Sequence, residues 1–367
     1  MRVAFIGTRG VPPSYSGFET AVNEIGRRMV ERGHQVDIFC RTSHYAAAER
    51  TGLHLGMRLH YLPAVRQKHL ETITNTALAA LRLPPDAAVI CMGVGNAPVI
   101  RLLELAGRRA VFNVDGADWQ RAKWGGLASR YLRACERLAA GGKSILVADA
   151  AAVENYYRVE FGRPSRLVPY GADPPSDRGT ETVDKFGLTT GEYLLWVGRL
   201  VPENDPLAFL EGVRRAGITS PAVVVGDSTY QDDYKAEMRA AAPTNAVFTG
   251  FQFGTAYQQL TTHAGLFVLA ASVGGTHPVL VEQMAAGNAI LARDTDSNRE
   301  VLGDTGLFWQ TPDELAALLR EVWPDRERRQ HLGEELQARA RERYSWDEVT
   351  TSYLVLCAES LGRATSR

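Results

Sequence analysis

The stretch Ser272–Ala292, SVGGTHPVLVEQMAAGNAILA, has the composition of a ligand-binding turn that leads into an apolar helix. The apolar run before it predicts a buried strand, and Gly274 and Gly275 allow the backbone to turn sharply after that strand. Thr276 is expected to cap the helix, and Pro278 suits its first turn. Because N–H groups at a helix N-terminus are unpaired and the helix dipole is positive there, a diphosphate is the ligand that this turn favours.

Glu282 is the acid of this helix, and it falls about one turn beyond the helix start. Its carboxylate can reach past a bound diphosphate to a sugar hydroxyl. The apolar neighbours Val279, Leu280 and Met284 favour a hydroxyl partner on a nucleotide ribose over a solvated acid. His277 either donates to phosphate or sugar or only fills the helix start. The structural alternative for the whole stretch is one more strand, turn and helix of a parallel sheet.

Arg199 follows a second apolar strand, YLLWVG, and shares its loop with Asn204. A guanidinium at a strand end can contact two phosphate oxygens while a leaving diphosphate gains charge. We expect Arg199 to converge on the same phosphates as the N–H groups of residues 274–276. The alternative is an exposed loop arginine.

The first loop and the start of the helix after it carry Arg9, Gly17, Phe18 and Glu19. Glycines in this loop give a ligand a close approach to the backbone. We expect Gly17 and Phe18 to contact a donor, and Arg9 and Glu19 to contact an acceptor. For Glu19 the alternative role is a partner of the helix dipole.

Asp115 follows the apolar strand AVFNV, where a carboxylate could accept the proton of an acceptor hydroxyl or hold a sugar. The run DWQRAKW places Arg121 and Lys123 beside Trp124. Cationic and aromatic groups together suit a lipid diphosphate and sugar acceptor near an anionic membrane. An ordinary amphipathic helix is the alternative for this run.

Three function classes are disfavoured. The sequence GTRG is not the G-x-G-x-x-G fingerprint, and the acid near the second strand end, Asp37, lies within the strand, which argues against a dinucleotide oxidoreductase. A net charge of −1 argues against nucleic acid as a partner. The DTD at residues 294–296 resembles a metal-binding motif, but it follows the helix and strand that close the expected diphosphate site and is therefore predicted to be a turn.

Length and composition indicate two domains in a reducing compartment. A chain of 367 residues with 45% apolar residues can form two cores. The cysteines Cys40, Cys91, Cys135 and Cys357 lack metal-ligand spacing and are expected to be reduced and structural. MRVAFIG enters a strand directly, and no run reaches the roughly 18 apolar residues of a membrane span. We expect a cytoplasmic protein whose contact with the inner face of the membrane, if any, is peripheral.

Apolar strands alternate with helical segments twice along the chain, which predicts two Rossmann-like α/β domains facing across a cleft. The Pro- and Gly-rich run RLVPYGADPPSDRG is predicted to link them. The expected domains are residues 1–168 and 169–345. The last helix, within residues 346–367, is expected to pack back on the first domain through Val349, Tyr353 and Leu356.

Five motifs resemble a bacterial family 4 glycosyltransferase of the GT-B type, and in particular its rhamnosyltransferase-like subgroup. They are IGTRGVPPSYSGFET, MGVGNAP, NVDGADWQRAKWG, VGRLVPENDP and SVGGTHPVLVEQMAAGN with SNREV after it. The resemblance covers essentially the whole chain, and five ordered matches are far more specific than any one. It implies a sugar nucleotide held by the second domain, an acceptor held by the first, and transfer between them without a metal.

The chain departs from the family pattern at two positions. Family members usually carry two glutamates with seven residues between them; the second corresponds to Glu282, but the first position is Gly274. The usual arginine–lysine pair appears as Arg199 with Asn204. Loss of a carboxylate suits a deoxy-sugar such as rhamnose, and loss of the lysine leaves Arg199 with more of the charge neutralisation.

The resemblance implies transfer of L-rhamnose from dTDP-rhamnose, with retention, to a polyprenyl-diphosphate-linked or growing cell-surface glycan. No cofactor is expected, since the nucleotide-sugar is a substrate. The alternatives are a transferase that uses another nucleotide hexose, such as a UDP-sugar, and a non-catalytic nucleotide-sugar-binding protein.

The expected site residues fall into three groups. The candidate catalytic residues are Asp115, Arg199 and Glu282. The candidate donor-binding residues are Gly17, Phe18, Arg199, Asn204, Gly274, Gly275, Thr276, His277 and Glu282. The candidate acceptor-binding residues are Arg9, Glu19, Arg121, Lys123 and Trp124.

Overall fold

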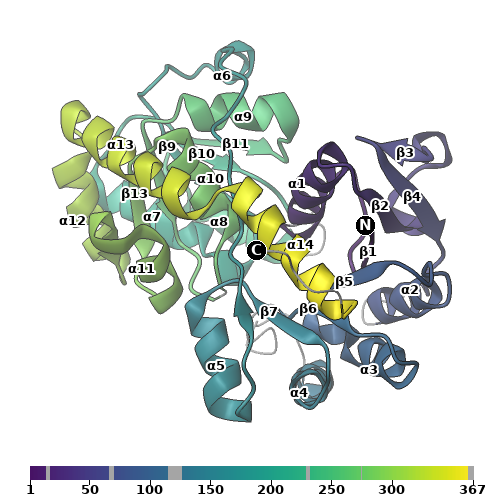
Figure 1. Cartoon of the computed structure of the whole chain (residues 1–367). Helices are drawn as coiled ribbons and strands as arrows, with labels where there is room; N and C mark the ends of the chain where they lie inside the picture. Colours follow the sequence, from purple (N-terminus) through teal and green to yellow (C-terminus); the bar gives the residue numbers. More distant parts are fainter. Residues whose placement is uncertain (14–16, 66–69, 115–125, 229–231, 274, 363–367) are drawn as a thin grey trace. The chain divides into compact units, whose positions relative to one another are not determined.

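The computed structural model describes residues 1–13, 17–65, 70–114, 126–228, 232–273 and 275–362. The chain divides into two compact units (Figure 1). Unit 1 comprises Met1–Tyr170 and Trp346–Arg367, and unit 2 comprises Gly171–Ser345. Each unit is a sheet of mostly parallel strands with helices packed on it, so the expected α/β architecture is confirmed.

Unit 1 is built on an eight-stranded sheet in the described part of the chain, with the order β3-β4-β2-β1-β5-β6-β7-β8. All neighbouring pairs are parallel except β3 with β4. The strands are β1 (Arg2–Ile6), β2 (Gln35–Arg41), β3 (Leu53–His54), β4 (Met57–Leu62), β5 (Ala88–Met92), β6 (Ala110–Asn113), β7 (Ile145–Ala148) and β8 (Arg166–Leu167). The chain order along the sheet reverses between β1 and β5, which makes that edge a topological switch point.

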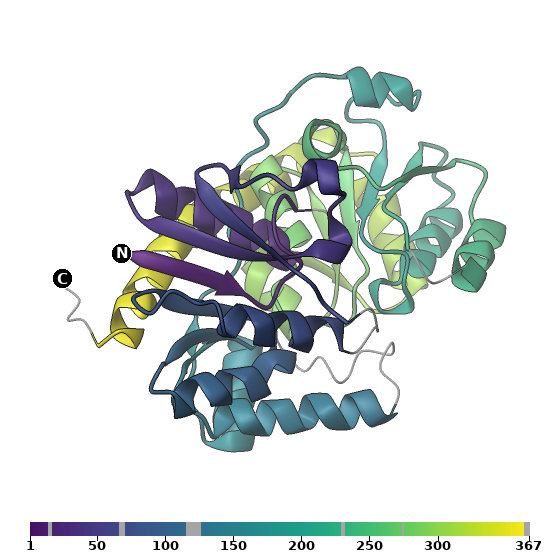
Figure 2. The ribbon, with the colours of Figure 1, turned by 90° about the vertical axis from the view of Figure 1, so that its right-hand side faces the viewer.

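The helices of unit 1 follow the hydrophobic periodicity of the sequence. They are α1 (Gly17–Glu31), α2 (Glu71–Ala80), α3 (Ala97–Leu105), α4 (Gly126–Ala140), α5 (Ala151–Phe161) and α14 (Trp346–Ser360). Helix α14, yellow in Figures 1 and 2, lies beside α1 and against β5 and β6. The side chains of Val349, Tyr353 and Leu356 are buried there, because their spacing puts them on one helix face.

The described residues of unit 2 form six parallel strands in the order β11-β10-β9-β12-β13-β14. The strands are β9 (Leu194–Val197), β10 (Ala222–Val225), β11 (Ala246–Gly250), β12 (Leu266–Leu269), β13 (Ile290–Arg293) and β14 (Leu307–Trp309). The helices are α6 (Glu181–Lys185), α7 (Pro206–Ala216), α8 (Asp232–Ala241), α9 (Gly254–Thr262), α10 (Pro278–Ala286), α11 (Asp296–Leu302), α12 (Pro312–Val322) and α13 (Arg326–Arg343). Its switch point lies between β9 and β12.

The central strands of both units are buried on both faces, as continuous apolar sequences predict. Trp196 and Trp309 are the largest buried side chains of unit 2. All four cysteines are buried and free, and burial raises the pKa of Cys40 and Cys357 to about 12. In the described ranges, no helix has the length and apolarity that crossing a bilayer requires.

Candidate active site

Arg199 lies in the loop after β9, at the carboxyl edge of the unit 2 sheet and next to its switch point. This loop is held against the loop after β10. A methyl group added at Gly226, whose φ is 133°, would lie 1.8 Å from the carbonyl oxygen of Gly198. The Leu200 N–H donates to the Asp227 carbonyl at 3.2 Å. Backbone contacts therefore fix the loop that presents Arg199.

Asn204 closes the same loop from its other end. Its side-chain Nδ2 donates to the backbone carbonyl of Arg199 at 2.9 Å, and its own N–H donates to the Val201 carbonyl at 3.0 Å. The side chain that stands where the family usually has lysine thus braces the backbone of Arg199.

The turn after β12 reaches this loop through a backbone hydrogen bond. The Ser272 N–H donates to the carbonyl of Glu203 at 3.3 Å. Glu203 is 9% exposed, and its Oε1 has no hydrogen-bond partner. The two loops flanking the switch point are therefore joined, which brings Arg199 and the turn that follows Ser272 to one edge of the sheet.

The expectation that Thr276 caps α10 is wrong. The N-cap is His277, which makes no side-chain capping bond, and Pro278 occupies the first turn as expected. Thr276 is one residue further out and 4% exposed, and Gly275 is also buried. His277 is half-buried, and its carbonyl accepts the Leu280 N–H at 2.9 Å. Thr276 cannot be the cap because the helical hydrogen bonds begin at His277.

Gly274 lies outside the described residues. Helix α10 ends at Ala286, and Gly287 follows in the left-handed conformation with φ 82°, which glycine adopts readily at a helix end. Leu280 and Met284 are fully buried, whereas Val279 is half-buried.

Glu282 is half-buried on α10, and a tyrosine from α9 contacts its carboxylate. The Tyr257 hydroxyl donates to Glu282 Oε2 at 2.5 Å. Burial, together with the charge of Glu282, raises the pKa of Tyr257 well above its usual value, so the hydroxyl keeps its proton. No local sequence pattern indicates this partner, because Tyr257 lies 25 residues earlier on another helix.

In unit 1, Arg9 and Glu19 are brought together. The Arg9 N–H donates to Glu19 Oε1 at 3.4 Å, and the Glu19 side chain is 3% exposed. Gly17 begins α1, and the Phe18 ring lies next to Gly93 in the loop after β5. Arg9, Glu19 and Phe18 thus lie around the switch point of the unit 1 sheet, whereas Arg199, Asn204 and residues 275–282 belong to unit 2.

Sequence reasoning missed a second group of charges beside that loop, at the end of β2. Arg41 is 6% exposed and donates to the carbonyls of Thr8 at 3.1 Å and Gly7 at 3.4 Å. Its Nη1 lies 3.7 Å from Glu71. Burial lowers the pKa of Arg41 to about 10, which still leaves the guanidinium charged at neutral pH. The sequence alone does not show whether an arginine at a strand end is buried or exposed.

Glu71 gathers further donors at the same place. Ser43 donates to Glu71 Oε1 at 2.6 Å, and His44 Nε2 lies 3.0 Å from the same oxygen. Burial, followed by the charge of Arg9, lowers the pKa of His44, so the imidazole is neutral at pH 7. Neutral and charged hydrogen-bonding groups therefore stand side by side, which suits recognition of hydroxyl groups.

Asp115, Arg121, Lys123 and Trp124 lie outside the described residues. The strand before them, β6, ends at Asn113, whose Nδ2 donates to the Tyr353 hydroxyl of α14 at 3.1 Å.

The DTD sequence forms a strand-to-helix turn. Asp294 accepts from Arg299 Nε at 2.5 Å and Nη2 at 2.8 Å, and the Thr295 hydroxyl caps α11 by accepting the Asn298 N–H at 3.2 Å. Among the residues that the structure describes, no group of three or more His, Cys, Asp or Glu side chains is placed to hold a metal ion.

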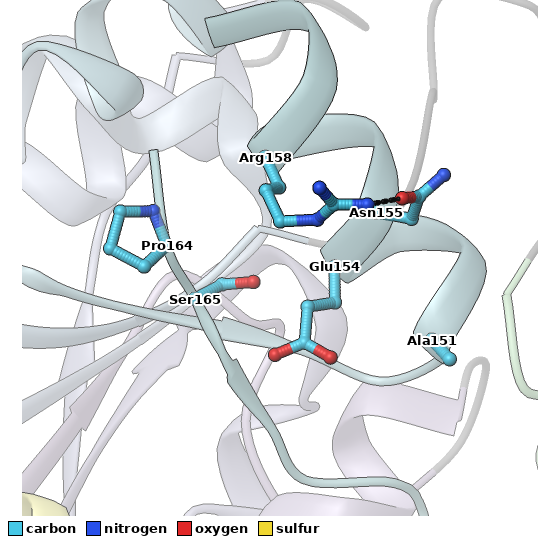
Figure 3. Close-up of a pocket in the computed structure, with 6 residues that line it drawn as sticks. All are labelled: Ala151, Glu154, Asn155, Arg158, Pro164 and Ser165. Carbon is cyan, nitrogen blue, oxygen red and sulfur yellow. Dashed lines mark hydrogen bonds between the residues drawn. The ribbon is translucent and has the colours of Figure 1, made fainter. Parts of the chain in front are cut away.

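A pocket of about 410 Å³ lies on unit 1 between α5 and the chain before β8 (Figure 3). Glu154 and Arg158 of the helix face it, and Pro164 and Ser165 form its other side. Arg158 donates to Asn155. None of its lining residues belongs to the expected site.

Comparison with known proteins agrees with the two-unit architecture. Sucrose-phosphate synthase from Thermosynechococcus elongatus superposes with a TM-score of 0.81 at 18% identity, covering 98% of this chain and 99% of that one. HepE from Anabaena, solved with UDP-glucose, gives a TM-score of 0.77 at 18% identity, with 99% of each chain covered. The fold is that of the GT-B glycosyltransferases.

Two family matches define the chain more closely. Residues 16–171 match the glycosyl transferase 4-like domain, and residues 180–339 match the glycosyl transferases group 1 domain. A GDP-mannose-dependent alpha-mannosyltransferase of Mycobacterium tuberculosis (strain CDC 1551 / Oshkosh) is 24% identical over 349 residues, which is 88% of this chain and 89% of that protein. The protein carries both glycosyl transferase domains and is a glycosyltransferase.

Proposed function

We propose that the protein is a metal-independent hexosyltransferase that moves L-rhamnose from dTDP-rhamnose, with retention, to a lipid-linked or growing cell-surface glycan. The observation that supports the donor site is the arrangement at the switch point of unit 2, where Arg199 follows β9 and the N-terminus of α10 follows β12. Ligands of open α/β sheets bind at such points, and an arginine beside a helix N-terminus suits a diphosphate.

In the proposed step the bond between the sugar C1 and the β-phosphate oxygen breaks, and its electron pair stays on that oxygen. Arg199 and the backbone N–H groups at the start of α10 stabilise the charge that develops there. The acceptor hydroxyl oxygen forms the new bond to C1 on the face that the diphosphate leaves. Its proton passes to a phosphate oxygen or to Asp115, and no separate enzyme nucleophile takes part.

Glu282 is proposed to accept a hydrogen bond from a ribose hydroxyl of the donor, about one helical turn beyond the diphosphate. His277, the N-cap of the same helix, is proposed to donate to phosphate or sugar. Glycine stands at position 274, where related enzymes usually have an acid, and this favours a donor sugar with fewer hydroxyls to recognise. L-rhamnose, a 6-deoxy sugar, fits that loss.

On the acceptor side we propose Arg9 and Glu19, extended by Arg41, His44 and Glu71, as groups that recognise hydroxyls of the acceptor glycan. Their mixture of donors and acceptors supports this assignment. Arg121, Lys123 and Trp124 remain proposed contacts to a lipid diphosphate at a membrane surface.

The second candidate donor is a UDP-sugar, because HepE was solved with UDP-glucose. GDP-mannose is a third, through the name of the mycobacterial relative. Slow donor hydrolysis is measured by incubating the protein with dTDP-rhamnose, UDP-glucose or GDP-mannose in the absence of acceptor. Each donor is tested with and without EDTA. Preferential release of dTDP supports the proposal. Preferential release of UDP or GDP replaces the donor, and activity that EDTA abolishes contradicts metal independence.

A further inference from the structure

The contact between Tyr257 and Glu282 is the end of a buried chain of hydrogen bonds that runs between α9 and α10. Gln283 is fully buried, and Thr261 and Asn288 are 2% and 4% exposed. Asn288 Nδ2 donates to the Thr261 carbonyl at 2.9 Å and to Gln283 Oε1 at 2.6 Å. Gln283 Nε2 then donates to Thr261 Oγ1 at 3.2 Å and to the Tyr257 hydroxyl oxygen at 3.4 Å.

The direction of this chain follows from its first member. A backbone carbonyl can only accept, so Asn288 must turn its NH₂ group toward Thr261. The same NH₂ group also donates to Gln283, so Gln283 must turn its amide oxygen toward Asn288. Its amide nitrogen then faces Tyr257. The Tyr257 oxygen accepts a hydrogen bond from Gln283, and its own O–H is then directed at Glu282. Along the series Asn288, Gln283 and Tyr257, each member donates to the next, and Tyr257 donates to the Glu282 carboxylate.

We propose that Tyr257 is a positioning residue that fixes the carboxylate of Glu282 for recognition of the donor ribose, with Gln283 and Asn288 holding the tyrosine hydroxyl in place. This inference rests on the proposed function of the α10 site. A donor at 2.5 Å is characteristic of a short, charge-assisted hydrogen bond to an ionised carboxylate. Such a bond fixes the rotation of the carboxylate and leaves it an acceptor of hydroxyl hydrogens.

Burial and the neighbouring carboxylate raise the pKa of Tyr257, which keeps its proton available for this role. An ionised carboxylate has about four acceptor positions, and the bond from Tyr257 takes one of them. Without the tyrosine hydroxyl, the Glu282 side chain regains rotational freedom and must lose it again when the nucleotide binds.

The test compares a nucleoside diphosphate with its 2′,3′-dideoxy analogue, which for dTDP, already a 2′-deoxynucleotide, removes the 3′ hydroxyl alone. Kd is measured by calorimetry for dTDP, UDP and GDP with the wild-type protein, and the tightest of the three is paired with its dideoxy form. We expect the wild type to prefer the hydroxyl-bearing ligand by about tenfold, the size of one hydrogen bond to a charged group. Glu282→Gln should remove most of this preference.

Tyr257→Phe should reduce the preference to roughly threefold, since the acid is present but no longer fixed. Gln283→Met, which removes the donor behind Tyr257, should lower it by a smaller factor. The matched control is Tyr193→Phe, because the fully buried Tyr193 donates to the Leu260 carbonyl at 2.5 Å and has no bond to Glu282. Its preference should equal that of the wild type, even if its stability falls.

The possible outcomes distinguish failure of the proposed function from failure of the positioning role of Tyr257. Failure of the wild type to bind any of the three diphosphates contradicts the proposed function itself. Binding without a hydroxyl preference leaves the function in place and overturns the role of Glu282 and of Tyr257. A full preference in Tyr257→Phe overturns the positioning role alone. If that variant does not fold, as judged by circular dichroism, an unchanged preference in Gln283→Met overturns it instead.

Discussion

The two units fix the loops at their switch points by different means. Among the described residues, unit 1 buries six acidic or basic side chains, namely Glu19, Arg28, Asp37, Arg41, Glu136 and Asp149. Unit 2 buries two, Glu203 and Arg329. In unit 1 the buried guanidinium of Arg41 holds the first loop by donating to backbone carbonyls of that loop. In unit 2 the corresponding loop is held by the contact of Gly226 with Gly198 and by neutral amides.

This difference has a physical consequence for each unit. Buried charges stabilise only while their partners remain ionised, so the framework of unit 1 should respond to pH and to loss of a single partner. Glycine contacts and neutral hydrogen bonds are insensitive to pH but intolerant of added volume. A neutral framework also leaves Arg199 and the α10 N-terminus as local sources of positive potential for a diphosphate.

The largest effect is expected from adding a methyl group in unit 2. Gly226→Ala places a carbon 1.8 Å from the Gly198 carbonyl oxygen at a φ of 133°, and should cost about 4 kcal/mol from strain and overpacking. The control Gly217→Ala has a φ of 71° with nothing within 4 Å, and should cost about 1 kcal/mol. Hydrogen exchange of peptides covering β9 and β10 measures both. Equal losses of stability in Gly226→Ala and Gly217→Ala would show that the contact between Gly226 and Gly198 does not hold the unit 2 loop.

A smaller loss is expected from removing the buried guanidinium of unit 1. Arg41→Met leaves the carbonyls of Gly7 and Thr8 without their donor and Glu71 without a counter-charge, and should cost about 3 kcal/mol. Hydrogen exchange of β1 and β2 reports this change. Arg109→Met, at an exposed arginine that donates to the Lys143 carbonyl, should cost less than about 0.5 kcal/mol. If Arg41→Met were as stable as the wild type, the charge of Arg41 would not be what holds the first loop.

The smallest effect concerns pH. Asp37 is fully buried, with Arg2 Nε and His60 Nε2 each 2.7 Å from its oxygens. Burial alone raises the pKa of Asp37, but the hydrogen bonds from Arg2 and His60 outweigh it and hold the pKa below its ordinary value of 3.8.

Because the folded-state pKa is lowered, this carboxylate stabilises unit 1 fully above pH 3.8 and loses that contribution as pH falls through the lower value. Asp37→Asn should therefore be less stable at pH 7 by roughly 1.5 kcal/mol and lose less stability below pH 4. Urea unfolding at pH 7 and pH 3, monitored by hydrogen exchange of β2, measures the stability at pH 7 and its loss in acid. An acid dependence identical to the wild type would exclude Asp37 as a source of the pH response.

The repeated strand–helix alternation was enough to predict two parallel-sheet units, because burial on both faces requires continuous apolar strands. The start of α10 was predicted in part: Pro278 stands in its first turn and Glu282 about one turn further on, as expected. The cap was misplaced by one residue, since Thr276 and His277 both stand at the helix start and local preference favours threonine.

The supporting residues could not be predicted. Tyr257 and Gln283 meet only because α9 and α10 pack together, and Arg41 is buried only because the first loop folds over the end of β2. Such contacts join residues distant in sequence, where neither periodicity nor spacing carries information. The role of Asn204 as a backbone brace was likewise hidden, because its amide could equally have faced a ligand.

The most direct test of the account is the binding of a nucleoside diphosphate to unit 2 through Arg199. Two hydrogen bonds that hold this loop are accepted by the backbone carbonyl of Arg199, and both are retained in Arg199→Ala. Calorimetry with the tightest of dTDP, UDP and GDP should show affinity about thirtyfold weaker in Arg199→Ala. Arg214→Ala, on the exposed face of α7, should match the wild type. Wild-type affinity in Arg199→Ala would contradict a diphosphate site at this switch point.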